Sequence, residues 1–125
     1  MGDGQRLRRE SFKSAKPIRM PAPFVPPSRP WSDGEWLILQ EGCRARVMED
    51  KWYSYVESNR LYIHRSWTGM GMFECQFEPR DGAWIITEAV VESDPEVFKN
   101  KRPWDSDFLE FVIAGVLLKR GRSLA

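Results

Sequence analysis

The densest group of chemically capable side chains lies in one short run, residues 61–69, with the sequence LYIHRSWTG. Successive side chains of a β-strand point to opposite faces of the sheet. One face would then carry Leu61, Ile63, Arg65 and Trp67, and the other Tyr62, His64 and Ser66. Because the first two residues of the first set are apolar, we expect that face to be the core side, with the cation and the indole at the strand end.

An arginine beside an aromatic plane can hold a phosphate or a carboxylate and can stack on a base. We therefore predict a ligand-binding site centred on Arg65 and Trp67. The residues that would complete it are His64, Lys51, Trp52 and Thr68. Two alternatives stay open: Arg65 could cover the rim of the core with its apolar stem, and the indole of Trp52 could belong to the core.

His64 is the only histidine, and hence the only side chain whose ordinary pKa lies near neutrality. Ser66 is poorly placed as its nucleophile, because two residues on one face of one strand do not present that geometry. A structural histidine bonded to a neighbouring strand is the alternative, so we predict no catalytic residue. Cys43 and Cys75 lack CxxC spacing, which predicts buried thiols and neither a metal nor a cofactor.

Strands joined by short turns must position these residues. Aromatic and β-branched runs predict strands over 51–56, 61–67, 71–77 and 83–91, with a weaker strand over 44–48. Residues 57–60 predict a hairpin connection, and residues 79–82 a type I turn. Consecutive short connections of this kind favour an antiparallel meander. Residues 32–34 predict a turn, and the apolar run 36–39 is consistent with more than one element type.

Two helices are predicted after the last strand. Ser93 and Glu96 have capping-box spacing, which predicts a short helix ending by residue 100. The run Asp105-Ser106-Asp107, with two acidic residues, predicts the start of a second helix, and Gly121 its end. Residues 108–118 leave only a narrow polar face, so this helix should be buried on the sheet or shared with a partner. We predict an α+β fold: an antiparallel β-meander of about four to five strands packed against a C-terminal α-helix, in one domain over residues 31–125.

Residues 1–30 form a basic, proline-rich arm. Seven Lys or Arg against two acidic residues give this arm +5, and because the whole chain is +1, the remainder is −4. We expect residues 1–16 to be disordered and residues 17–30, with six prolines, to be extended. The arm could contact an acidic partner or fold onto its own domain. The near-zero net charge and the mixed charges around the aromatic residues argue against a nucleic-acid partner.

The chain shows no pattern expected of a membrane or secreted protein. Its longest apolar run, residues 111–118, is far shorter than a membrane span, and its N-terminus lacks the apolar core of a signal sequence. We therefore expect a cytoplasmic protein.

The strings MEDKW at 48–52 and LYIHRSWTG at 61–69, followed by an acidic segment and the apolar run 108–118, resemble a family of small uncharacterised bacterial domains. The resemblance covers residues 42–120. Members stand alone or are joined to other domains, including ADP-ribosylglycohydrolase-like ones. The resemblance implies an accessory role near nucleotide or ADP-ribose chemistry, and it assigns no catalytic residue.

The leading hypothesis is a non-enzymatic binding or accessory module for a nucleotide or ADP-ribose-type ligand. It rests on the concentration of Tyr, His, Arg and Trp without an assembled catalytic set. The first alternative is a protein-interaction partner, such as an immunity protein or a homodimer, because the C-terminal helix is very apolar. The second is a small hydrolase that uses His64 with a carboxylate.

Overall fold

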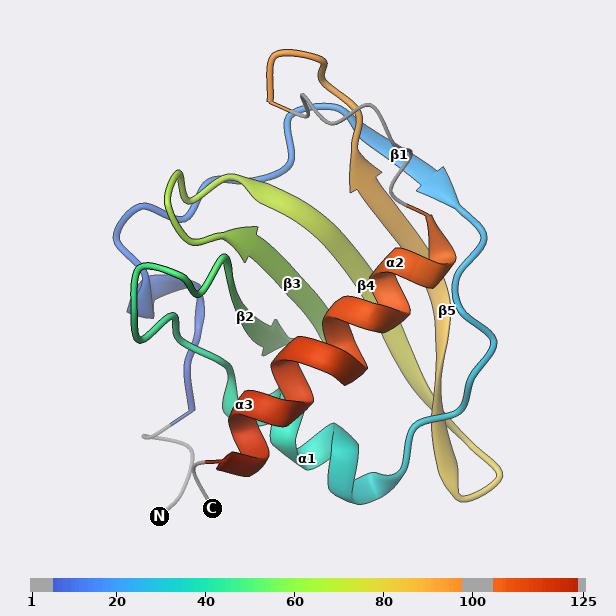
Figure 1. Ribbon diagram of the computed structural model, residues 1–125. Helices are drawn as coiled ribbons and strands as arrows, with labels where there is room; N and C mark the ends of the chain where they lie inside the picture. The colour runs from blue at the N-terminus through green and yellow to red at the C-terminus, as the bar shows by residue number, and fades with distance from the viewer. Residues whose placement is uncertain (1–5, 98–104, 124–125) are drawn as a thin grey trace.

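A computed structural model describes residues 6–97 and 105–123. Its centre is a five-stranded antiparallel sheet in the order β1-β5-β4-β3-β2 (Figure 1). The strands are β1 (Pro21–Phe24), β2 (Trp52–Glu57), β3 (Arg60–Arg65), β4 (Gly71–Arg80) and β5 (Ala83–Glu92). The helical elements are η2 (Arg9–Ser11), α1 (Asp33–Glu41), α2 (Ser106–Phe111), η3 (Val112–Leu117) and α3 (Leu118–Ser123). The predicted α+β fold is confirmed, with β2 to β5 as the meander.

Two-residue turns join β2 to β3 and β4 to β5. Ser58 and Asn59, between β2 and β3, have φ of 52° and 61°, which matches the twist of a type I′ hairpin. Asp81 and Gly82, between β4 and β5, have φ of 52° and 79°. The type I turn predicted over 79–82 is therefore wrong, although the left-handed residue expected at its end is present at Gly82. Both strands run up to this tight turn, and Pro79 lies inside β4.

Helix α1 begins where a turn was predicted. Ser32 caps it: its hydroxyl accepts from the Glu35 amide at 3.1 Å, and the Glu35 carboxylate accepts from the Ser32 amide at 2.9 Å. This capping box starts a helix from residues that are also typical of turns. The strand predicted over 44–48 is wrong, because between α1 and β2 only a single bridge, Cys43 to Ser54, joins the sheet.

The C-terminal helical segment is continuous from Ser106 to Ser123, with a π-helical stretch, η3, in its middle. Asp105 caps its start as predicted, accepting from the Phe108 amide at 3.1 Å. The predicted end at Gly121 is wrong, since α3 runs through this residue. Residues 95–97 form turns and not the beginning of the predicted 93–100 helix, whose last residues lie outside the described part of the chain.

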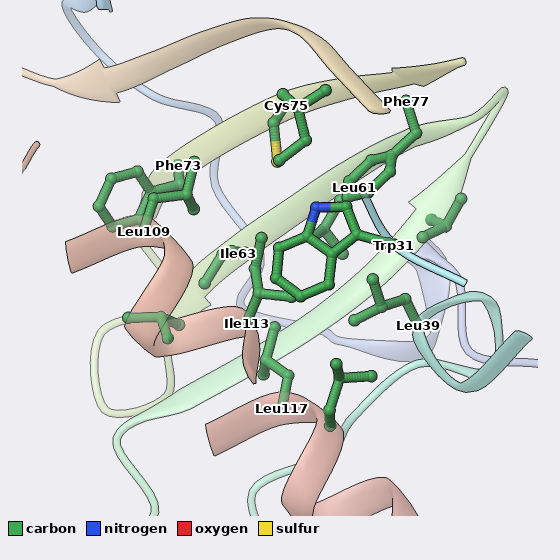
Figure 2. Close-up of a cluster of buried hydrophobic side chains, with 14 of the residues drawn as sticks. Trp31, Leu39, Leu61, Ile63, Phe73, Cys75, Phe77, Leu109, Ile113 and Leu117 are labelled. Carbon is green, nitrogen blue, oxygen red and sulfur yellow. The ribbon is translucent and has the colours of Figure 1, made fainter. Parts of the chain in front are cut away.

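The core lies between the sheet and this helical segment. Leu61 and Ile63 of β3 are fully buried, as strand alternation predicts. Figure 2 shows them facing Ile113 and Leu117, with the Trp31 indole among them. Packing on the core thus fixes the face of β3 that carries Arg65. The strand predicted over 61–67 ends at Arg65, so Trp67 lies in the turn that follows it.

The arm packs on the rest of the molecule from residue 6 onward, where disorder was expected up to residue 16. Its β1 pairs with β5, and the Phe12 ring stacks on Tyr53 at 4.1 Å between centroids. The buried Glu92 carboxylate accepts from the amides of Arg19 and Met20, at 2.7 and 2.9 Å. The alternative in which the arm folds onto its own domain is the one observed. None of the described helices is long and apolar enough to cross a membrane.

Candidate functional site

Side chains of the HRSWTG string, residues 64–69, form hydrogen bonds that tie the connection between β3 and β4 to the loop before β2. The Trp67 indole Nε1 donates to the Met48 carbonyl at 2.8 Å, and the Ser66 hydroxyl donates to the Asp50 carbonyl. Gly69 adopts φ of 77°, where a Cβ would lie 1.9 Å from the Ser14 carbonyl oxygen of the arm. Much of this distinctive string therefore builds the local structure that holds two loops together.

His64 lies on the opposite face of the sheet from Arg65, as alternation along β3 requires. It is only 3% exposed, and its ring lies parallel to Tyr53 with centroids 4.9 Å apart. Its Nδ1 lies 2.9 Å from the Gly69 carbonyl, which can only accept, so Nδ1 carries the proton. Its Nε2 lies 3.2 Å from the Tyr55 hydroxyl, which donates to the neutral ring.

Burial lowers the pKa of His64 below its ordinary value, and the bond to the Gly69 carbonyl opposes this change in part. Both ring nitrogens are occupied and the ring is sealed from solvent. The structure therefore does not bring His64 together with Arg65 and Trp67, and its environment is that of a structural histidine bonded to neighbouring strands.

The other predicted residues do meet. Lys51, Arg65, Trp67 and Thr68 line a pocket of about 100 Å³. Trp52 lines the adjoining hollow but is buried in the core, so the alternative in which its indole belongs to the core is the one observed. The Arg65 guanidinium lies 5.1 Å from the centre of the Trp52 ring, a cation–π contact. Partial burial lowers the pKa of Arg65, yet an arginine keeps its charge in proteins. The alternative in which Arg65 covers the core rim is also consistent with this contact.

A second hollow, of about 440 Å³, adjoins this pocket, and Lys51 and Arg65 line both. We call the two hollows together the groove. Its remaining lining residues are Glu49, Asp50, Trp52, Phe108, Phe111 and Val116. The three residues of the C-terminal helical segment were not predicted as site residues. The sequence feature that could have indicated them is the narrow polar face of that segment. Such a helix carries more apolar side chains than one core-facing side can bury.

Asp50 shapes the loop before β2. Its carboxylate accepts from the Arg46 amide at 2.9 Å and lies 3.4 Å from the Arg120 guanidinium. The bond to the Arg46 amide is the main reason that the pKa of Asp50 is lowered. Arg120 also donates to the Trp52 carbonyl at 2.6 Å. The loop that carries Lys51 is thus tied to the C-terminal helical segment, which fixes two walls of the groove.

Large exposed apolar side chains gather around the groove. Among the residues that the structure describes, seven large apolar side chains are exposed. Trp67 and Phe111, which are 72 and 57% exposed, line the groove, and Met48, which is 75% exposed, is joined to Trp67 by a hydrogen bond. The Trp67 indole is held by Met48 while its ring faces solvent. A fixed, exposed indole beside two cations is the arrangement that contact sites use.

No protein family, curated protein or solved structure matches the chain. The resemblance to small bacterial domains thus stays a prediction, and the function has to be argued from the groove. Within residues 6–97 and 105–123, no group of three His, Cys, Asp or Glu side chains is placed to hold a metal ion.

Proposed function

We propose that the protein is a non-enzymatic cytoplasmic binding module whose contact site is the groove, and that its ligand is an anion bearing a flat ring, of the nucleotide or ADP-ribose type. The observation that carries this proposal is the exposed, hydrogen-bonded Trp67 indole beside Lys51 and Arg65. The buried, unpaired thiols of Cys43 and Cys75 are typical of a reducing compartment.

Each wall of the groove has a separate task in this proposal. Lys51 and Arg65 hold the phosphate, and the Trp67 ring stacks on the base. The Thr68 hydroxyl accepts from the Met70 amide at 3.2 Å, so its own proton is available to donate to the phosphate. The pocket of about 100 Å³ encloses only the anionic group, because whole small-molecule sites measure about 300–1,000 Å³. The rest of the ligand would lie in the larger hollow.

The surroundings of His64 give the hydrolase alternative less support. A general base must reach the proton that it removes, and this ring is buried with both nitrogens bonded inside the protein. The groove is lined by cations, an indole, a hydroxyl and the carboxylates of Glu49 and Asp50, and His64 is not among its lining residues. An activity screen in which wild type and His64→Ala give equal traces would remove the hydrolase hypothesis.

The test is titration of the full chain with AMP, ADP and ADP-ribose, followed by calorimetry or by tryptophan fluorescence. Arg65→Met keeps an apolar stem over Trp52 but removes the charge, so we expect binding weaker by about tenfold or more with little change in melting. Lys13→Met, which removes an exposed cation outside the groove, is the matched control and should bind normally. Absence of binding by wild type at about 1 mM ligand, or equal binding by Arg65→Met, contradicts the proposal.

Protein interaction is the second candidate function, and a specific observation favours it. Three exposed apolar residues, Met48, Trp67 and Phe111, line the groove or adjoin it, and Phe111 lies outside the pocket of about 100 Å³. Contiguous exposed apolar surface rimmed by charge is typical of protein contact sites.

A further inference from the structure

Two neighbouring surfaces of the molecule have opposite character. The first, which we call the knob surface, carries exposed apolar side chains and two cations and consists of Met48, Lys51, Arg65 and Trp67. The second, which we call the helix hollow, is a shallow depression of about 430 Å³ lined by Asp107, Glu110, Phe111, Ala114 and Gly115. The two surfaces are complementary in charge, because Lys51 and Arg65 lie on the first and Asp107 and Glu110 on the second, and the exposed Trp67 indole could enter the depression.

The helix hollow owes its shape to two small residues. A Cβ on Gly115 would lie 3.1 Å from carbons of the Phe111 ring, closer than side chains normally approach. Glycine therefore lets this ring lie against the helix surface, where it stays 57% exposed and forms one wall. The small side chain of Ala114, which also lines the hollow, leaves the depression open. π-helical segments such as η3 are rare, and they occur frequently at functional sites.

The knob surface and the helix hollow lie on the two sides of the groove. Phe111 lines the helix hollow and the groove, while Lys51 and Arg65 line the groove and the pocket below Trp67. In Figure 1 the loops before β2 and after β3 lie at the same end of the sheet, and the C-terminal helical segment crosses the sheet. Both surfaces are thus accessible to one partner at the same time.

We propose that the partner of these surfaces is a second copy of this chain, in a dimer with twofold symmetry. The knob surface of each copy enters the helix hollow of the other, so that Lys51 and Arg65 face Asp107 and Glu110 across the interface. Phe111 belongs to the helix hollow and also lines the groove beside the knob surface. A twofold axis near this ring would therefore form both contacts at once. A self-complementary patch of this kind defines an isologous interface.

This dimer goes beyond the nucleotide-type ligand and does not depend on it. The carboxylates of the second copy would occupy the cations that hold a phosphate in the proposed ligand site. A ligand that binds only the open groove would therefore shift the equilibrium toward the monomer.

The test begins with the mass of the wild-type chain, measured by light scattering and sedimentation from about 10 µM to about 1 mM. We expect the mass to rise with concentration from 14.6 kDa toward twice that value. A monomer over this whole range overturns the proposal.

Charge reversal then identifies the surfaces. Lys51→Glu and Glu110→Lys should each be monomeric, because in either dimer both contacts would join like charges. Mixing the two variants restores opposite charges at both contacts, so a heterodimer should form. The double variant, with both changes in one chain, should form its own dimer again. Persistence of dimers in both single variants, or a mixture that stays monomeric, overturns the proposed interface.

Three controls separate this interface from other effects. In dilute solution, where the wild type is monomeric, the far-ultraviolet spectrum and melting curve of each variant should match wild type, since both altered side chains lie outside the core. Lys13→Glu changes an exposed cation away from the groove and should dimerise normally. Trp67→Ala should weaken the dimer by about tenfold or more, because a fixed indole that enters a hollow is typical of an interface hot spot.

Discussion

His64 and Trp67 are three residues apart in one string, yet they lie in contrasting environments. His64 belongs to the closed side, where the arm covers Tyr53, and it is 3% exposed. Trp67 belongs to the open side, beside the groove, and it is 72% exposed. The residue with the more reactive side chain is the sealed one. Exposure and partners, rather than residue type, therefore decide which part of the string is available for contact.

The closed side is held by stacked rings and by the arm. Phe12 lies on Tyr53, which lies parallel to His64, and the Arg44 guanidinium is 5.0 Å from the centre of the Phe12 ring. The backbone of Lys16 forms an isolated β-bridge with Met70. On the open side a hydrogen bond to the Met48 carbonyl holds the Trp67 indole. Substitutions on the two sides should consequently affect different properties, stability on one and binding on the other.

Gly69→Ala should have the largest effect, because it breaks the closed side where the arm meets the β3–β4 connection. The new methyl group would lie 1.9 Å from the Ser14 carbonyl oxygen, and the backbone φ of 77° is strained for alanine. We expect a loss of more than about 3 kcal/mol in the free energy of unfolding, measured by urea denaturation.

Gly82→Ala is the matched control for that change. Its φ is 79°, but nothing lies within 4 Å of the added carbon. It should cost only the strain of a left-handed residue, about 1–2 kcal/mol. Equal losses for the two variants would mean that the arm does not press on Gly69 in solution.

The pH dependence of the free energy of unfolding tests whether His64 is buried on the closed side. Burial lowers its pKa in the folded protein below the ordinary value of 6.5, so the unfolded chain takes up a proton at a higher pH than the folded one. The stabilisation is complete above pH 6.5 and is lost as the pH falls from there through the lowered pKa. Urea denaturation at several pH values between about 7.5 and 5 should show this decrease in the wild type.

His64→Gln isolates the contribution of the imidazole. The variant should be less stable than wild type at neutral pH, but its stability should fall less on acidification. Carboxylates contribute equally to both proteins and cancel in the difference. Identical pH profiles for the two proteins would show that the ring titrates normally and is therefore not sealed.

Most of the sheet could be predicted, because both of its signals are local in the sequence. These signals are the alternation of side chains between the two faces of the strand along 61–63 and the short turns between strands. The same alternation already placed His64 on the face opposite Arg65, so its inclusion in the binding site conflicted with the strand prediction. The helix at α1 was missed because Ser32 to Gly34 suits a turn as well as a capped helix.

The remaining features depend on contacts between distant residues. The arm has no strong periodicity, and its order comes from partners such as Tyr53 and Glu92, far along the chain. Phe111 reaches the groove wall from a segment whose π-helical stretch no local pattern indicated. Lys51, Arg65, Trp67 and Thr68 could be predicted as neighbours because they flank the same strand pair, whereas the helix side of the groove required the tertiary fold.

Trp67→Ala should have the smallest effect on stability and is the most direct test of the open side. The change removes one exposed hydrogen bond to Met48 and little buried surface, so we expect a loss of at most about 1 kcal/mol. Tyr53→Ala, which truncates a buried ring on the closed side, should cost about 3–5 kcal/mol. Thermal melting and urea denaturation measure both. A large loss for Trp67→Ala would make the indole a structural support of the two loops, and its exposure would then no longer argue for a contact site.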